Sequence, residues 1–159
     1  MDYEVIITKY QDKFEEEVSN IAIRAWTPIR AVAKVDLGEE IYQKVFDNWQ
    51  ETKKNSIICS MKKNDGQVAL INGKVVGFIS YIVRGAIGEI LENAVDTDYK
   101  GRGIAQKLYQ CVLDKMKEQG AEIATVLTGL DEGHAAARRA YEKIGFEKNL
   151  KHITYYKTL

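Results

Sequence analysis

Proline and cysteine are scarce in this chain, and no run of apolar residues is long. Pro28 is the only proline, and it predicts an interruption of a helix just after Trp26. Cys59 and Cys111 are the only cysteines, and their spacing matches no metal or redox motif. We therefore expect free thiols in a reducing compartment rather than a disulfide framework.

A secretory signal and a membrane span are also missing. No apolar stretch approaches the roughly 20 residues that cross a bilayer. The segment Met1–Val5 lacks the basic and apolar regions of a signal peptide. These absences predict a cytoplasmic protein that does not bind membranes.

Neither sign of charge is in excess, because 23 Lys and Arg balance 23 Asp and Glu at a formal net charge of +0. A broad nucleic-acid surface needs clustered basic residues, so we expect no nucleic-acid partner, although a local patch stays open. His134 lies near Asp131 and Glu132, but no second His or Cys accompanies it. We therefore predict no metal site.

The length of 159 residues fits a single domain, residues 1–159, that buries its own core. The strongest local signal is Asn72-Gly73 between two β-type runs, which predicts a hairpin. Residues 56–63 fit either an extension of the preceding helix or a new piece. The remaining elements, read from apolar periodicity, are a strand over 3–9, a helix from 12, a second helix from about Gly38, a strand over 89–95, a helix from 104 to about Gly120, a strand over 123–127, a helix over 135–144, and strand material after Phe146. This order predicts an α+β fold, a mixed sheet with helices on its faces.

The join between the strand ending at Val95 and the next helix carries the first chemical signal. It reads Lys100-Gly101-Arg102-Gly103-Ile104-Ala105. Glycines allow a close backbone approach, and the free N–H groups of a helix N-terminus suit a phosphate or pyrophosphate. The turn lacks the Gly-Lys-Ser/Thr ending of a P-loop and the third glycine of the dinucleotide fingerprint. Taken alone, it also fits a tight connection without a ligand.

Two motifs resemble the GCN5-related N-acetyltransferase (GNAT) family. Residues 98–108 resemble its motif [Gln/Arg]-x-x-Gly-x-[Gly/Ala], with Gly103 and Ala105 at the last two defined places and Lys100 where Gln or Arg is usual. Residues 134–146 resemble Asn-x-x-Ala-x-x-x-Tyr-x-x-x-Gly-Phe, with His134 in place of Asn. Together with the hairpin, the resemblance covers roughly 68–146.

The resemblance implies a fold and a cofactor. It implies an α/β sandwich with a mixed, mostly antiparallel sheet of about six to seven strands and about four helices on its faces. It also implies that acetyl-CoA binds and that its acetyl group passes to a primary amine by direct attack in a ternary complex. The residues that it implies for cofactor binding are Asn93, Ala94, Val95, Lys100, Gly101, Arg102, Gly103, Ile104, Ala105, Gln106 and His134.

Within this set, main-chain groups carry most of the expected contacts. The resemblance implies an oxyanion donor in the main-chain N–H near Asn93, and pantetheine contacts from the main chain of Ala94 and Val95. His134 fits a loop cap as well as a cofactor contact.

Catalysis requires a proton acceptor, because an ammonium group has a pKa of about 10.4 and must be neutral to attack. The resemblance points to Glu89, six residues before Val95, with Glu92 as the rival and a water chain as the third option. In a regular strand these carboxylates face opposite sides, and a bulge, common in this strand of the family, would change that. Either glutamate also fits an ordinary solvated carboxylate.

Tyr141 occupies the family position of the general acid toward the CoA thiolate, although it also fits a core tyrosine. Trp26, Tyr42, Phe46 and Trp49 recur at helical spacing, which fits core packing or the acceptor side of the site.

The acceptor stays open between a small-molecule amine and a protein amine. A non-catalytic acyl-CoA-binding sensor of the same fold is the alternative function. A homodimer is also open, because dimers are frequent in the family.

Overall fold

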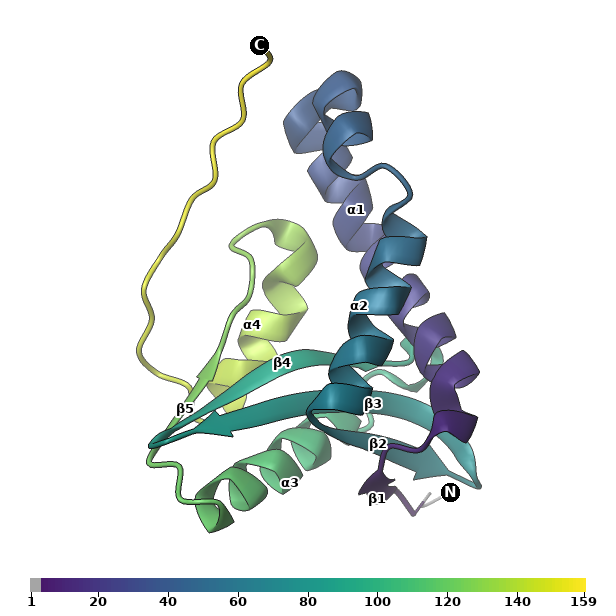
Figure 1. Ribbon diagram of the computed structural model, residues 1–159, viewed down its shortest axis with the longest axis vertical. Coiled ribbons are helices and arrows are strands. Elements are labelled where there is room, and N and C mark those ends of the chain that lie inside the picture. Colours follow the sequence, from purple (N-terminus) through teal and green to yellow (C-terminus); the bar gives the residue numbers. More distant parts are fainter. Residues whose placement is uncertain (1–3) are drawn as a thin grey trace.

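The computed structural model describes residues 4–159, which form a sheet with helices against both faces (Figure 1). The helices are α1 (Glu15–Val45), α2 (Trp49–Lys63), α3 (Ile104–Glu118) and α4 (Ala135–Lys143). The strands are β1 (Ile6–Lys9), β2 (Asp65–Ile71), β3 (Lys74–Arg84), β4 (Ile87–Val95) and β5 (Ile123–Val126). Short 3-10 turns η1 (Asp12–Phe14), η2 (Thr97–Tyr99) and η3 (Glu132–His134) precede α1, α3 and α4.

The sheet follows chain order, β1-β2-β3-β4-β5. The first three pairings are antiparallel, and only β4 and β5 are parallel, with α3 as the crossover between them. The expected hairpin is present, with Asn72 and Gly73 both at positive φ (51° and 78°) between β2 and β3. The mixed, mostly antiparallel sheet predicted from the sequence is therefore confirmed.

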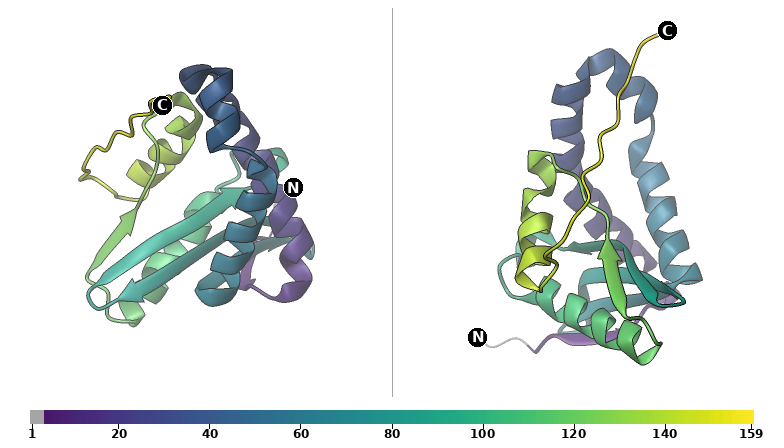
Figure 2. Two further views of the ribbon diagram at one scale, coloured as in Figure 1. Left: turned by 45° about the horizontal axis from the view of Figure 1, so that its top comes forward. Right: turned by 90° about the vertical axis from the view of Figure 1, so that its left-hand side faces the viewer.

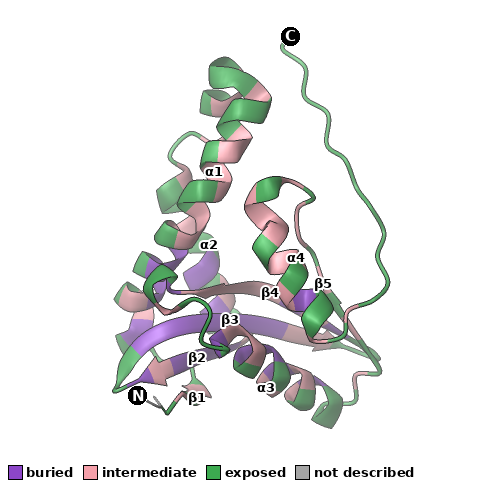
Figure 3. Ribbon diagram, turned by 180° about the vertical axis from the view of Figure 1, so that it is seen from behind, coloured by how far each residue is buried: buried purple, intermediate pink, exposed green. Residues whose placement is uncertain are grey.

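Apolar side chains fill both faces of the sheet. Alternation along β3 sends Phe78 toward α1 and α2, where it packs with Ile21 and Ile57, and sends Ile79 toward α3. The buried residues, purple in Figure 3, accordingly run along the central strands of the sheet. No helix formed by residues 4–159 is long and apolar enough to cross a bilayer.

The predicted strand count is wrong, because residues 4–159 form five strands rather than six to seven. The sequence after Phe146 has strand-like composition, yet residues 147–159 form no ladder and are exposed along their length. Figure 1 shows them as an extended segment that rises beside α4. β-propensity describes a side chain that fits a pleated surface, and it does not supply a partner strand.

The predicted break at Pro28 is also wrong, because α1 continues through that residue. The fixed φ of proline is itself helical, so Pro28 removes one hydrogen bond without reversing the chain. The interruption lies at Gly38, whose φ of 74° falls outside the helical region. Residues 56–63, left open by the sequence, belong to α2, and they bury Ile57 and Met61.

Candidate active site

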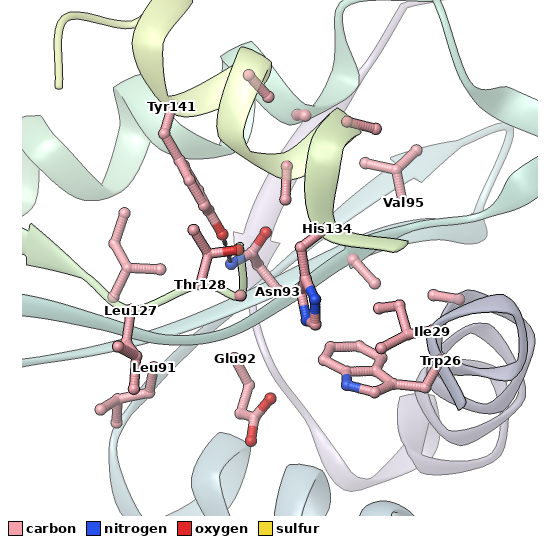
Figure 4. Close-up of a pocket in the computed structure, with 18 of the residues that line it drawn as sticks. Trp26, Ile29, Leu91, Glu92, Asn93, Val95, Leu127, Thr128, His134 and Tyr141 are labelled. Atoms are coloured by element: carbon pink, nitrogen blue, oxygen red, sulfur yellow. Dashed lines mark hydrogen bonds between the residues drawn. The ribbon is translucent and has the colours of Figure 1, made fainter. Parts of the chain in front are cut away.

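A cleft opens where β4 and β5 separate. Their parallel pairing ends at Ile90 and Val126, and the residues that follow, Leu91 and Leu127, both line the cleft (Figure 4). The cleft has a volume of about 950 Å³ and is lined by residues of α1, α2, β3, β4, α3, the 127–134 segment and α4, and by His152 and Thr154 of the C-terminal segment. The main-chain groups of residues 91–95 that face away from β3 have no strand beside them among residues 4–159. These strand edges can hydrogen-bond an extended ligand.

A β-bulge in β4 decides where the two candidate glutamates point. Asn93 pairs with Ile79 and Ile90 pairs with Tyr81, so β4 has one more residue than β3 between these pairs. The extra residue places Glu89 and Glu92 on the same face of the sheet, rather than on opposite faces. The shared face is the outcome that a bulge in this strand predicts, and both side chains line the cleft.

Ser80, on the neighbouring strand β3, stabilises this bulge. The Glu92 N–H donates to Ser80 Oγ at 3.3 Å, and the hydroxyl groups of Ser80 and Ser60 lie 2.8 Å apart. Ser80 is fully buried on β3. The serine thus gives the displaced N–H of the bulge a partner that the strand ladder does not supply.

The two glutamates have different surroundings. The Glu92 carboxylate is 18% exposed and accepts two hydrogen bonds from Lys53 Nζ, at 3.1 and 2.9 Å. That ammonium also lies 4.0 Å from the centre of the Trp26 ring. Glu89 is 41% exposed and pairs at 3.3 Å with Arg84. Glu92 is therefore the better shielded of the two carboxylates.

Tyr141 reaches the cleft from α4, and its hydroxyl group belongs to a row of hydrogen-bonded side chains that also includes Asn93 and Tyr109. Asn93 Nδ2 donates to the Tyr141 hydroxyl at 2.9 Å, and the Tyr109 hydroxyl donates to Asn93 Oδ1 at 2.9 Å. The rings of Tyr141 and Tyr109 are 5.2 Å apart. In Figure 4 the Tyr141 hydroxyl points at Asn93, whereas the Glu92 carboxylate points away from it.

Burial raises the pKa of the Tyr141 hydroxyl above its usual value of 10.0. Hydrogen bonds with Asn93 and Tyr109 oppose this rise, and the charge of Glu92 adds to it. Burial also raises the pKa of Tyr109, which belongs to the same row of side chains. Both hydroxyl groups therefore keep their protons at neutral pH.

The turn before α3 has the geometry of an anion site. Gly101 and Gly103 have φ angles of 77° and 73°, a region that glycine enters without steric cost. The first helical hydrogen bond joins Lys107 N–H to Gly103 O, so the N–H groups of residues 104–106 precede it. Lys100, Gly101 and Ala105 line the cleft, which places this helix end at its wall.

Three predicted cofactor residues use their side chains elsewhere. Ile104 is buried in the core, and Gln106 Nε2 donates to Ala140 O at 3.0 Å. The Arg102 guanidinium lies 4.9 Å from the Tyr99 ring. For Ile104 and Gln106, the main-chain N–H is the group that remains available to a ligand.

The loop before α4 forms the remaining wall. His134 Nδ1 lies 2.7 Å from Asp131 Oδ2, a bond between two side chains of this loop, and neither side chain caps the helical turn that follows it. Burial raises the pKa of Asp131, but the hydrogen bond and charge of His134 together with backbone hydrogen bonds outweigh it, and the net shift is downward. The hydroxyl of Thr128 is buried in the cleft wall without a hydrogen-bond partner among residues 4–159. An unpaired buried hydroxyl facing a cleft suits a polar ligand.

Four aromatic residues were assigned either to the core or to the acceptor side. Trp26 alone lines the cleft. Tyr42 and Phe46 pack against each other at 5.4 Å. The Arg30 guanidinium lies 4.0 Å from Phe46 and 5.8 Å from Trp49. Tyr42, Phe46 and Trp49 therefore gather around Arg30, where α1 ends and α2 begins, and none of them lines the cleft.

Sequence reasoning missed Lys53, Ser80, Tyr109 and Thr128. Lys53 is one of many lysines on polar helix faces, and Tyr109 lies among apolar positions of an amphipathic helix. Only the fold brings them to β4, across 39 and 16 residues of chain.

The sequence matches a known family of proteins. Residues 17–146 match the model of the acetyltransferase (GNAT) family. An uncharacterized N-acetyltransferase of Methanocaldococcus jannaschii is 33% identical over 150 residues, which cover 83% of this chain and 65% of that protein. N-alpha-acetyltransferase 30 of Schizosaccharomyces pombe is 36% identical over 94 residues, covering 56% of this chain and 61% of that protein. The chain thus spans less than two thirds of these relatives.

Solved structures agree in fold. A protein from Pyrococcus horikoshii superposes with a TM-score of 0.73 at 25% identity, over 94% of this chain and 92% of that one. The PaiA N-acetyltransferase of Thermoplasma acidophilum, in complex with coenzyme A, superposes with a TM-score of 0.68 at 19% identity, over 91% and 90%.

Proposed function

Because this chain belongs to the acetyltransferase (GNAT) family, we propose that it transfers the acetyl group of acetyl-CoA to a primary amine, within a single domain formed by residues 1–159. One observation carries the proposal: Glu92 and Tyr141 line the same cleft, and they lie on different sides of the bulge in β4. Such a pair can take a proton from an amine and give one to a leaving thiolate.

Three features of the cleft fit acetyl-CoA. Cationic Lys100 and the N–H groups at the start of α3 suit a pyrophosphate. The unpaired edge of β4 at Asn93–Val95 suits the amides of an extended pantetheine arm. The Thr128 hydroxyl offers one further polar contact in the wall. The cofactor, when bound, supplies an acetyl thioester, whose carbonyl is the electrophile.

The residues of this chain then have separate tasks. Glu92 accepts a proton from the acceptor ammonium, directly or through a water molecule, and Glu89 is the second carboxylate on the same face. The main-chain N–H near Asn93 stabilises negative charge on the carbonyl oxygen. The Tyr141 hydroxyl is protonated at neutral pH, and burial raises its pKa further above 10.0; it donates that proton to the sulfur.

The acceptor is an amine that enters from the side of α1 and α2. There the Trp26 ring and the Glu92 carboxylate form a place that already holds one ammonium group, that of Lys53. Aromatic faces and carboxylates both favour cations. The name of the Schizosaccharomyces pombe relative refers to an N-alpha amine, so we include peptide N-termini, beside small-molecule amines, among the acceptors.

Incubation with acetyl-CoA and a panel of amines tests the proposal. The panel contains peptides with free N-termini, the same peptides with blocked N-termini, lysine derivatives, polyamines and aminoglycosides, and thiol release is followed. We expect amine-dependent release that Glu92→Gln and Tyr141→Phe both lower. Tight CoA binding without release on any amine would instead support the non-catalytic sensor.

A further inference from the structure

The ammonium group of Lys53 lies where the proposed function places the acceptor amine. It is 2.9 Å from Glu92 Oε2 and 4.0 Å from the centre of the Trp26 ring. Its side chain is only 16% exposed, in a cleft whose volume is about 950 Å³. A lysine side chain rarely leaves bulk water to this extent unless it is paired.

Other ion pairs of the chain do not share this setting. Lys44 and Glu40 form a pair of the same length, 2.9 Å, but their side chains are 69% and 65% exposed. Lys62 lies 2.7 Å from Glu15 and is 43% exposed. Neither lysine lines the cleft, whereas Lys53 does. Lys53 therefore differs from these two lysines in where it lies, shielded inside the cleft, and not in having a carboxylate partner.

From this placement we infer that Lys53 is a self-acetylation site, modified within the same molecule by the acetyl thioester that the cleft binds. The inference rests on the proposed function, because it uses the same donor, base and acid. Trp26 and Glu92 hold the lysine nitrogen as they would hold an external acceptor.

The reaction balances with the groups present. Glu92 takes one proton from the Lys53 ammonium, which leaves a neutral amine. The nitrogen attacks the thioester carbonyl carbon, the new C–N bond forms, and the C–S bond breaks. The nitrogen then loses a second proton to water, and the sulfur leaves as a thiol with a proton from Tyr141. Tyr141 regains a proton from water and Glu92 releases its own to water, so that one proton is released overall. The products are acetyl-Lys53 and free CoA.

Acetylation removes the positive charge that pairs with Glu92. The carboxylate would then face the cleft without its internal partner and be open to an external ammonium group. Self-acetylation thus removes the Lys53 ammonium group from the acceptor site, while Trp26 and Glu92 remain available to bind an external amine.

Peptide mapping by mass spectrometry after incubation with acetyl-CoA tests this inference. We expect Lys53 to be acetylated at least about tenfold faster than Lys44, with a first-order rate that does not change with protein concentration. Excess CoA should slow modification of Lys53 alone. Glu92→Gln should lower it by at least about tenfold, in line with loss of a proton acceptor, and Lys53→Arg should abolish it. Lys44→Arg, the matched control, should leave it unchanged.

A small acetylating reagent provides a readout that does not depend on the cleft. N-hydroxysuccinimidyl acetate should modify exposed Lys44 before shielded Lys53, the reverse of the order with acetyl-CoA. The same order with both reagents, or a Lys53 rate that grows with protein concentration, would overturn the inference. Turnover of external amines with Lys53 unmodified would overturn this inference alone, whereas loss of both would count against the proposed function.

Discussion

At the scale of single residues, two hydrogen bonds that the sequence motif does not reveal fix the direction of the Tyr141 hydroxyl. Asn93 donates to it, and Tyr109 orients Asn93 from the other end. The tyrosine therefore has a fixed direction as well as a retained proton. Fixed direction matters because proton transfer requires hydrogen-bond distance to the reacting atom.

Replacing Tyr141 by phenylalanine removes the proposed acid and keeps most of the packing. We expect kcat for acetyl transfer to fall by about 10²- to 10⁴-fold, with a change in KM for acetyl-CoA of less than about threefold. Steady-state kinetics measures both. Tyr109→Phe is the matched variant, since it removes a hydroxyl that acts through Asn93, and its effect on kcat should be smaller. An equal loss in both variants would show that Tyr141 only positions other groups.

The buried tyrosines also predict how stability depends on pH. Burial raises the pKa of Tyr109 and of Tyr141 in the folded chain, whereas tyrosines of the unfolded chain keep a pKa near the ordinary value of 10.0. The unfolded state then loses protons first, so these groups stabilise the fold below about pH 10 and destabilise it as pH rises above that value. Denaturant unfolding between pH 8 and 11 measures this. Tyr109→Phe should reduce the slope above pH 10, and an unchanged slope would contradict the assignment.

At the scale of elements, both ends of α3 depend on a glycine with positive φ, Gly103 at the start (73°) and Gly120 at the end (90°). Only the first end lies at the cleft. Alanine at either position costs about 1–2 kcal/mol of stability, because left-handed backbone crowds a Cβ.

The pair Gly103→Ala and Gly120→Ala therefore separates strain from binding. Both variants should lose similar stability in denaturant unfolding. Only Gly103→Ala should weaken CoA binding, by about tenfold or more in calorimetry. Equal CoA affinities in the two variants would place the pyrophosphate away from the start of α3.

The bulge of β4 is the element that positions Glu92, and Ser80 is its main support. Ser80→Ala leaves the Glu92 N–H without its partner and should cost about 1–3 kcal/mol, as for a buried unpaired donor. Thermal or denaturant unfolding measures the loss. The acetyl-transfer rate should fall as well, since the carboxylate direction depends on the bulge. Full activity at reduced stability would separate the bulge from catalysis.

The sequence predicted well those elements that local chemistry determines. Asn72-Gly73 requires positive φ at both positions, and the structure has it. The glycine-bearing turn before α3 and the place of Tyr141 on α4 followed from motifs. The bulge was anticipated only as an option, because register depends on pairing between β3 and β4, which no short stretch of sequence encodes.

Other features could not be predicted from local patterns. Lys53 meets Glu92 across 39 residues of chain, through the packing of α2 on the sheet. Residues 147–159 have strand-like side chains but no partner strand among the described residues. Both cases turn on tertiary contacts that intrinsic propensity does not contain.

At the scale of the whole molecule, the cleft divides the helices into two groups. Figure 2 shows α1 and α2 rising on one side and α4 standing on the other, and α3 lies across the sheet from α1 and α2. Helix α4 packs on α3, and α1, α2, the edge of β4 and α4 all line the cleft, so a ligand that fills the cleft contacts both groups of helices. Such a ligand should stabilise the molecule as a whole.

Coenzyme A should accordingly raise the melting temperature. At about 100 times its Kd, a ligand that binds only the folded state adds about 2.7 kcal/mol, which corresponds to roughly 5–10 °C for a chain of this size. Differential scanning fluorimetry measures the shift. Gly103→Ala should reduce it while Gly120→Ala should not, and a shift that is absent in the unaltered protein would contradict cofactor binding.

The central claim is that the opening between β4 and β5 binds acetyl-CoA with its sulfur at Tyr141. A crystal structure of the complex with coenzyme A tests it most directly. We expect the pyrophosphate at the N–H groups that begin α3, the pantetheine arm along Asn93–Val95, and the thiol within hydrogen-bond distance of the Tyr141 hydroxyl. Coenzyme A bound elsewhere, or with its thiol directed away from Tyr141, would contradict it.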